Sequence, residues 1–337
     1  MSVKGKLKDS LAFWENTIEA NSFILSVIKE GYRIPFIENP SSVFLSNNMS
    51  ARKYSKFVTT AINQLVLSGC VIEKSSRPYC INPLTVSINS NGKERLILDL
   101  RHENKCIEKQ KIKFEGSKEA LQYAKRANLM IKYDLKSGYH YVEIHKAFQQ
   151  YLGFSWSVNG EIKYYVFTVL PFGLSSASFL FTKLMREIVK YWRSLSYPII
   201  VYLDDGWCCL SPENVSEISN SIRQDLKFAG CVVNEEKSVW EPSYKLEWLG
   251  FVWDLKIGRV EIPDRKMAHF KEKLNYVLKN PDRVIARKLA SIIGQIISMS
   301  FVLGNVCQIM TRNLHLPIID RTCWDGYVVL DQNLLMN

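Results

Sequence analysis

Residues 199–210 have the sequence IIVYLDDGWCCL, in which two acidic residues and a glycine separate two apolar runs. The pattern predicts a β-hairpin that carries Asp204 and Asp205 at its tip. Asp-Gly is also a favoured hairpin turn, so Asp205-Gly206 could serve the backbone alone. Such a turn does not need Asp204, and adjacent carboxylates repel each other unless a cation lies between them. The stretch therefore favours a divalent-cation site over a simple turn.

A third acidic residue ends another apolar segment, 204 − 134 = 70 residues earlier in the chain. Asp134 follows Ile131-Lys132-Tyr133, and a lone acid in that position is usually a cap or turn residue. Two-metal phosphoryl chemistry, however, needs carboxylates from separate strands that converge on ions about 3.5–4 Å apart. Taken together, Asp134, Asp204 and Asp205 predict one catalytic cluster.

The composition describes a folded, basic protein. With 337 residues and 47% hydrophobic content, the chain can form two or three packed subdomains and is too apolar for a disordered tail. Lys and Arg outnumber Asp and Glu by 44 to 33, which gives a formal charge of +11. This excess favours a polyanionic partner, although a merely soluble basic protein would have the same composition.

Cysteine usage and hydropathy indicate an intracellular protein that is not secreted. The eight cysteines form no CxxC pair and have no histidine at a ligand-like spacing, so reduced thiols are expected. The charged stretch from Met1 to Asp9 lacks the apolar core of a secretory signal. No residue from Leu289 to Thr311 is charged, but Gln295 and the Gly304-Asn305 break predict two buried helices and no membrane span.

The hydrophobic pattern changes three times along the chain. It is helical to about residue 75, with a helix expected from Ala51, capped by Ser50, to Gly69. A hairpin through Asn91-Gly92 is expected next, and a helix capped by Ser175 or Ser176 follows later. The expected strands are 84–88, 95–100, 131–135, 141–144, 163–169, 199–203, 207–210 and 249–253. After Pro263 the pattern is helical and basic again.

The order of the motifs closely resembles that of retroelement reverse transcriptases. They are NPL at 82–84, RLILDLR at 95–101 with Asn104, DLKSGYH at 134–140, LPFGLSSA at 170–177, YLDD at 202–205, NEEK at 234–237 and LG at 249–250. The resemblance covers roughly residues 10 to 315. It is strongest for the DIRS-like group of tyrosine-recombinase retrotransposons, with gypsy-like LTR elements next.

The resemblance implies an α+β right-hand polymerase, with an antiparallel palm sheet flanked by helices and a helical thumb. The expected boundaries are 1–75 for the N-terminal helical region of the fingers, 76–262 for fingers and palm, 263–315 for the thumb and 316–337 for a truncated C-terminal connection. About 22 residues after the thumb are too few for another domain, so RNase H, protease and integrase activities are not expected.

The resemblance also implies the chemistry, which is RNA-directed DNA polymerisation. The expected partners are an RNA template, a DNA primer or duplex, and dNTPs, without a membrane. The expected cofactors are two Mg²⁺ ions, for which Mn²⁺ could substitute. Asp134 and Asp204 would be their principal ligands, Asp205 a less direct one, and the backbone carbonyl of Leu135 an additional one.

Several further residues match positions with family roles. Tyr139 matches the steric gate that rejects a ribose 2′-hydroxyl, although a buried palm aromatic would look the same. Lys93 and Arg95 match the residues that clamp the triphosphate, and could otherwise be solvated hairpin charges. Phe172 and Gly173 match the loop under template and nucleotide. Retroviral relatives have glutamine at the Phe172 position, so its polar contacts are not expected here.

The remaining matches lie toward the C-terminal half. Lys237 matches a proton donor to the leaving pyrophosphate, and Leu249-Gly250 match the primer grip. The thumb offers basic residues for the duplex backbone, unless they form an ordinary solvated face: Arg265, Lys266, Lys271, Lys273, Arg287 and Lys288.

Three other functions are compatible with parts of this pattern. One is a template-dependent RNA polymerase of the same fold, which Tyr139 and the leucine of YLDD disfavour. Another is a domesticated or decayed copy that binds nucleic acid or protein without catalysis. The third, a membrane protein, is disfavoured by the polar residues between 289 and 311.

Overall fold

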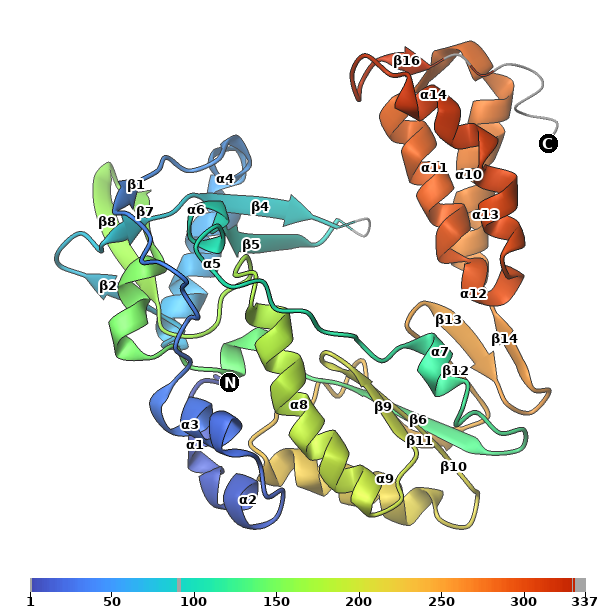
Figure 1. Cartoon of the computed structure of the whole chain (residues 1–337), viewed down its shortest axis with the longest axis horizontal. Helices are drawn as coiled ribbons and strands as arrows, with labels where there is room; N and C mark the ends of the chain where they lie inside the picture. Colours follow the sequence, from blue (N-terminus) through green and yellow to red (C-terminus); the bar gives the residue numbers. More distant parts are fainter. Residues whose placement is uncertain (1, 90–91, 329, 331–337) are drawn as a thin grey trace. The chain divides into compact units, whose positions relative to one another are not determined.

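The computed structural model describes residues 2–89, 92–328 and 330, and the chain divides into two compact units (Figure 1). The first unit comprises residues 1–115 and 131–242, and the second comprises residues 116–130 and 243–337. Each unit therefore consists of two separate stretches of the sequence.

Helices of the first unit form its N-terminal part and flank its later strands. They are α1 (Lys6–Asp9), α2 (Leu11–Asn16), α3 (Ser22–Glu30), α4 (Met49–Lys53), α5 (Ser55–Leu67), α6 (Arg101–Asn104), α8 (Ala177–Ser194) and α9 (Val215–Phe228), with the 3₁₀ helices η1 (Gly138–Tyr141) and η2 (Lys146–Tyr151).

The strands of the first unit form three sheets. A five-stranded sheet has the order β1-β3-β7-β8-β2, a four-stranded sheet has the order β11-β6-β10-β9, and β4 pairs with β5. Their bounds are β1 (Val43–Phe44), β2 (Val71–Lys74), β3 (Cys80–Ile81), β4 (Leu84–Ile88), β5 (Glu94–Leu98), β6 (Leu129–Asp134), β7 (Gly153–Val158), β8 (Glu161–Phe167), β9 (Ile199–Tyr202), β10 (Asp205–Leu210) and β11 (Val239–Ser243).

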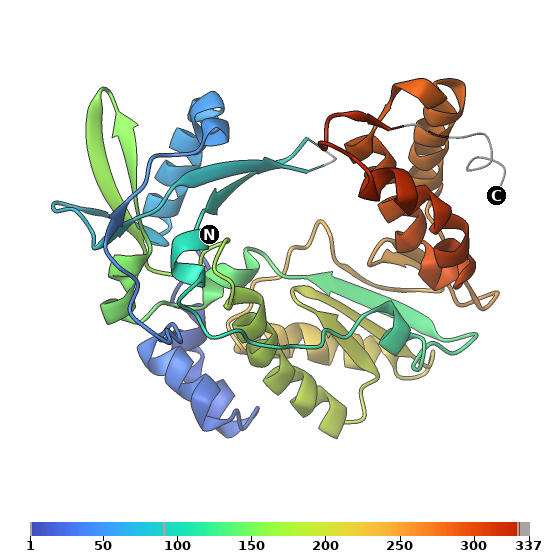
Figure 2. The ribbon, with the colours of Figure 1, turned by 45° about the horizontal axis from the view of Figure 1, so that its top comes forward.

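The four-stranded sheet packs against α8 and α9, which run beside it in Figures 1 and 2. Tyr133 of β6 is fully buried between Trp192 of α8 and Trp240 of β11, with ring centroids 6.2 and 6.0 Å away. Trp192 Nε1 donates a hydrogen bond of 2.8 Å to Asp225 of α9. Large buried rings stabilise a core through both area and contact, so this aromatic cluster fixes the helices on the sheet.

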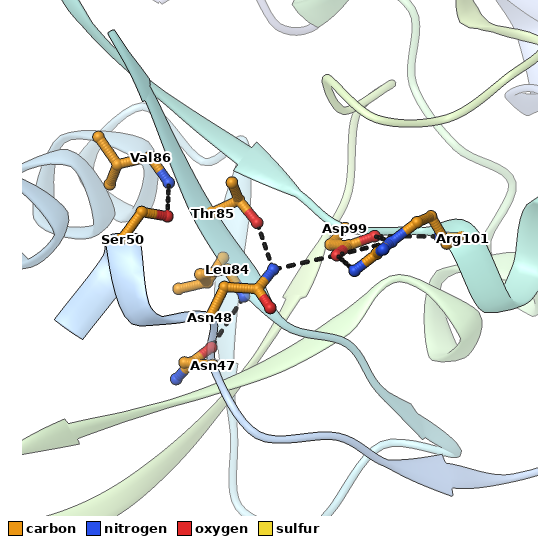
Figure 3. A network of polar contacts seen from close by, with 8 residues as sticks. All are labelled: Asn47, Asn48, Ser50, Leu84, Thr85, Val86, Asp99 and Arg101. Carbon is orange, nitrogen blue, oxygen red and sulfur yellow. Dashed lines mark hydrogen bonds and ion pairs between the residues drawn. The ribbon is translucent and has the colours of Figure 1, made fainter. Parts of the chain in front are cut away.

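The β4–β5 hairpin is anchored by polar side chains that precede α5 (Figure 3). The Asn48 amide donates to Thr85 at 2.5 Å and to Asp99 at 3.0 Å. Ser50 does not cap a helix, because it lies inside α4 and its hydroxyl accepts from the Val86 backbone N–H at 3.1 Å. The expected 51–69 helix is also wrong in extent, since it divides into α4 and α5.

Most predicted strands are present, with corrected ends. Residues 141–144 are an exception, because Tyr141 ends η1 and only Glu143 and Ile144 form isolated bridges. Ser176 occupies the N-cap position of α8, but its side chain makes no capping hydrogen bond. Asn91 of the predicted hairpin turn lies outside the described residues, whereas β4 and β5 pair as expected.

The second unit combines short strands with a group of helices. Its elements are α7 (Ser117–Ala120), β12 (Lys245–Trp248), β13 (Phe251–Asp254), β14 (Arg259–Glu261), α10 (Asp264–Lys279), η3 (Pro281–Arg283), β15 (Val284–Ile285), α11 (Ala286–Ser298), α12 (Ser300–Leu303), α13 (Val306–Thr311), η4 (Asn313–His315), α14 (Leu316–Ile319) and β16 (Tyr327–Val328). The sheet β12-β13-β14 is antiparallel.

The uncharged stretch 289–311 folds as shorter helices. It spans most of α11, then α12 and α13, and Gly304 breaks the chain with φ +76°. Leu289, Ile292 and Ile293 are buried in the core of this unit. Among the described residues, no helix combines the length and apolar character that crossing a bilayer requires.

A buried acid lies in α6 of the first unit. Glu103 is 0% exposed, and neither of its carboxylate oxygens has a hydrogen bond of ordinary geometry within the described residues. Burial raises the pKa of this carboxyl, whereas its own backbone and the neighbouring Cys80 and Asn82 side chains act in the opposite direction. The fold therefore favours the neutral acid.

Glu103→Gln should stabilise the fold at neutral pH. A carboxyl group whose pKa is higher in the folded than in the unfolded protein makes the fold less stable as the pH rises from the unfolded pKa through the folded pKa. The free energy of unfolding of the variant should exceed that of the wild type by about 1–3 kcal/mol near pH 7.5, and should differ little from it near pH 4. Thermal unfolding at both pH values measures this, with the exposed Glu161→Gln as control. The prediction is contradicted if the difference in unfolding free energy between the variant and the wild type is the same at both pH values.

Candidate active site

The β9–β10 hairpin presents two aspartates at its tip. Tyr202 pairs with Asp205, so the two-residue turn consists of Leu203 and Asp204. Leu203 adopts a left-handed φ of +56°, which is strained for a bulky residue. The alternative in which Asp205-Gly206 forms the turn is therefore wrong, since both residues lie in β10.

Gly206 is required by packing and not by a turn. A β-carbon at this position would overlap the ring of Tyr133, which is fully buried on the neighbouring strand β6. The close approach of the two strands thus depends on the absence of a side chain. It also brings the end of β6 next to the aspartates.

Asp134 lies at that end of β6 and is held from several sides. The Leu135 backbone N–H donates to the Asp204 carbonyl at 3.0 Å, which joins β6 to the hairpin tip. Asn234 Nδ2 donates to Asp134 Oδ1 at 3.0 Å, and Lys237 Nζ lies 3.2 Å from Asp134 Oδ2. The structure therefore brings together all three acids and Lys237.

The acids form one electrostatic cluster. Burial, followed by the negative charges of Asp204 and Asp134, raises the pKa of Asp205 to about 6. Burial and the Asp134 charge also raise the pKa of Asp204, while Lys237 and Arg95 act in the opposite direction. Such mutual repulsion is what a bound divalent cation would relieve.

The donor chemistry suits a hard cation, but the present side-chain arrangement is not a complete metal site. Carboxylate oxygens are the ligands that Mg²⁺ prefers. In the part of the chain that the structure describes, no three His, Cys, Asp or Glu side chains are grouped so that they could hold a metal ion as they stand. In this arrangement both oxygens of Asp134 are engaged by Asn234 and Lys237.

An aromatic patch lies beside the acids. The Tyr139 ring contacts Phe172 and Phe181 at centroid distances of 5.2 and 5.7 Å. Burial and the nearby Asp204 raise the pKa of Tyr139. The Arg95 guanidinium lies 5.0 Å from the Phe172 ring centroid. Tyr139, Phe172 and Arg95 therefore lie next to one another, and the buried Phe181 packs behind the Tyr139 ring.

Gly173 allows the loop that carries Phe172 to reach β5. Its φ is +113°, and a β-carbon there would overlap the Leu98 carbonyl. The Asn104 amide donates to the Gly173 carbonyl at 2.9 Å and fixes the loop from the other side. Lys93 is exposed just before β5, and within the described residues its side chain has no ion-pair partner.

A chain segment that crosses α8 supports the hairpin from behind. Glu115 receives two hydrogen bonds from Arg193, at 2.9 and 2.6 Å, and Arg193 also donates to the Ile199 carbonyl at 2.8 Å. Phe114 packs on Tyr202 with a centroid distance of 5.6 Å. Arg193 thereby ties the end of α8 to the first residue of β9.

The remaining predicted residues belong to the second unit. Leu249 and Gly250 form the turn between β12 and β13, with φ of +47° and +75°, so the strand expected from residue 249 begins at Phe251. Of the basic residues predicted in this unit, four have internal partners: Arg265 with Glu247, Lys266 over Phe251, Arg287 with Asp325 and Lys288 over Tyr276. Among the described residues, Lys271 and Lys273 have none.

The sequence did not single out three residues that shape the site. Gly206 was considered only as a turn residue, and Asn234 only as part of a motif, although each fixes the position of a catalytic candidate. Arg193 belongs to none of the sequence motifs, and no local sequence signal reveals its two hydrogen bonds to Glu115, 78 residues away.

Comparison with known proteins gives a family match. Residues 73–253 match the family described as reverse transcriptase (RNA-dependent DNA polymerase). The retrovirus-related Pol polyprotein from transposon gypsy of Drosophila melanogaster is 28% identical over 248 residues, which are 71% of this chain and 22% of that protein. The transposon Tf2-3 polyprotein of Schizosaccharomyces pombe is 23% identical over 69% of this chain and 16% of its own length. The chain thus spans about a fifth of these relatives.

Solved structures show the same fold. A foamy viral protease-reverse transcriptase in complex with double-stranded DNA has a TM-score of 0.68 and 19% identity, and covers 97% of this chain and 58% of its own. The foamy viral protein in complex with an RNA/DNA hybrid has a TM-score of 0.65 and 18% identity, over 97% of this chain and 44% of its own. The predicted α+β right-hand polymerase fold is confirmed.

Gly206→Ala should disrupt the site by steric overlap. The added methyl group would force Tyr133 or the hairpin to move, at about 1–3 kcal/mol or more of unfolding free energy. Gly138→Ala is the matched control, because its β-carbon would lie 3.6 Å from Asp204 Oδ2, an ordinary contact. Chemical denaturation measures both variants. Equal stability of the two would refute the packing role of Gly206.

Proposed function

Because the chain belongs to the reverse transcriptase (RNA-dependent DNA polymerase) family, we propose that it is the polymerase core of a retrotransposon. It adds dNTPs to a primer 3′-hydroxyl on an RNA or DNA template. The observation that carries this proposal is the hydrogen bond from Leu135 to Asp204, which joins two strands so that Asp134, Asp204 and Asp205 meet in one partly buried cluster. Charge clusters of this kind are typical of phosphoryl-transfer sites.

Two divalent cations, Mg²⁺ or in its place Mn²⁺, are the proposed cofactors. Asp134 and Asp204 would hold them as principal ligands, with Asp205 and the Leu135 carbonyl in support. When bound, such ions activate the attacking hydroxyl and neutralise charge on the triphosphate. Asp134 is free for this role only once Lys237 leaves its carboxylate, and the 60% exposed Lys237 side chain has room to do so.

The proposed nucleotide site extends from the acids across the aromatic patch. Arg95 and Lys93 supply positive charge for the triphosphate, and a guanidinium suits this task because it donates two parallel hydrogen bonds. Lys237, released from Asp134, would protonate the leaving pyrophosphate. Tyr139, backed by Phe172 and Phe181, supplies the wall beneath the sugar.

The proposed nucleic-acid contacts follow the family's division of labour. Residues 1–75 and part of 76–262 act as fingers, the four-stranded sheet as palm and 263–315 as thumb. Leu249-Gly250 supports the primer. Since Arg265, Lys266, Arg287 and Lys288 already have internal partners, Lys271 and Lys273 are the thumb residues best able to contact phosphates.

Asp204→Asn should abolish most primer extension. Loss of one carboxylate removes charge that stabilises the bound cation, so we expect at least about a hundredfold lower rate on an RNA template with Mg²⁺. Asp9→Asn makes the same chemical change on exposed α1 and serves as control. A wild type without metal-dependent extension would favour a decayed copy, and equal rates for both variants would refute the assignment of the acids.

Tyr139→Ala should relax sugar selection. If the ring excludes the 2′-hydroxyl, its removal raises ribonucleotide relative to deoxynucleotide incorporation by about tenfold or more, in line with a contact of 1–3 kcal/mol. Tyr139→Phe retains the ring and should keep the selectivity of the parent. Competition between dNTPs and NTPs in primer extension measures the ratio. Preferential NTP use by the wild type would instead indicate an RNA polymerase.

A further inference from the structure

A cavity of about 480 Å³ lies in the first unit, lined by the N-terminal helices, β2 and η2. It shares no lining residue with the carboxylate cluster or the aromatic patch. Lysines dominate its charged lining and come from segments far apart in the sequence: Lys4, Lys8, Lys29, Lys74 and Lys146. The acidic residues in the lining are Glu30 and Glu143.

Backbone hydrogen bonds preform the walls of this cavity. The Tyr32 N–H donates to the Glu143 carbonyl at 2.7 Å, and the His145 N–H donates back to Tyr32 at 3.0 Å. A β-carbon on Gly31 would lie only 2.7 Å from His145 N, so the end of α3 is in tight contact with this segment. The Ile144 N–H donates to the Thr168 carbonyl at 2.8 Å. The lining segments are therefore fixed to one another before any ligand arrives.

The lysines differ in their internal contacts. Lys4 Nζ donates to the Gly69 carbonyl and to Thr168 Oγ1, both at 2.8 Å, and Lys29 pairs with Glu15. Within the described residues, Lys8, Lys74 and Lys146 have no ion-pair partner. Like charges held around one hollow repel each other, and an anion between them relieves that repulsion.

The size and lining of the cavity define the ligand. A volume of this order is usual for small-molecule sites and is too small for a nucleic-acid duplex. Ile28, Ile72 and Ile144 are the large apolar residues of the lining, beside five lysines. We propose that this cavity binds a small anion that carries several phosphate groups.

Titration with inorganic tripolyphosphate, without divalent cations and at low salt, tests the proposal. Lys74→Ala/Lys146→Ala removes two exposed cations that have no ion-pair partner among the described residues, and should weaken binding by about tenfold because two of the five lining lysines are lost. Lys56→Ala/Lys227→Ala removes the same charge from exposed positions of this unit outside the cavity, and should bind like the parent. Circular dichroism checks that each variant is folded.

Two results would overturn the proposal. Equal binding by the two double variants would mean that only net charge matters. Loss of binding in Arg95→Ala, with none in Lys74→Ala/Lys146→Ala, would place the anion in the proposed nucleotide site.

A short oligodeoxythymidine separates a free polyphosphate from a nucleic-acid backbone. Lys74→Ala/Lys146→Ala should bind the oligodeoxythymidine with the affinity of the parent, because the proposal assigns the cavity to a small anion and not to a nucleic-acid chain. If this variant lost the oligonucleotide while still binding tripolyphosphate, the cavity would serve nucleic acid and the small-anion assignment would be wrong.

Discussion

The hydrogen bond between the Leu135 N–H and the Asp204 carbonyl is the contact on which the site depends. The bonded residues are 204 − 135 = 69 positions apart in the chain, and their contact brings the Asp134 and Asp204 carboxylates into one cluster. Asp134 is buried and Asp204 and Asp205 are partly buried, and burial together with the repulsion between the acids raises the pKa of Asp205 to about 6. They persist because the surrounding sheet, the Tyr133 cluster and the Asn234 and Lys237 contacts hold them there.

Lys237 contacts the acids and is also exposed to solvent. Its ammonium group neutralises part of the negative charge while it lies 3.2 Å from Asp134. The Lys237 side chain is 60% exposed and that of Asp134 only 10%, so departure of the lysine returns its charge to water but leaves a mostly buried carboxylate without its counter-ion. A cation that binds the acids would replace it without breaking the fold.

Much of the fold and of the candidate site could be predicted from the sequence, for identifiable reasons. The β9–β10 hairpin and the end of β6 were predicted because apolar runs bounded by acids and glycine have a strong local signal. The turn position was wrong, because Asp-Gly is so favourable a turn that the left-handed Leu203 could not be anticipated. The sequence predicts Ser50 as a helix cap, but its hydroxyl instead accepts a hydrogen bond from the backbone N–H of Val86 in β4. Contacts such as Arg193 with Glu115 depend on segments that meet only after folding.

The discontinuity of the two units has a consequence for synthesis of the protein. Residues 116–130 emerge from the ribosome long before residues 243–337, with which they form one compact unit. The first unit likewise cannot close its central sheet until β11, ending at Ser243, has been made. The first unit can therefore fold once residue 242 has been made, whereas residues 116–130 must wait for the C-terminal stretch, and a cut between residues 242 and 243 leaves the second unit incomplete.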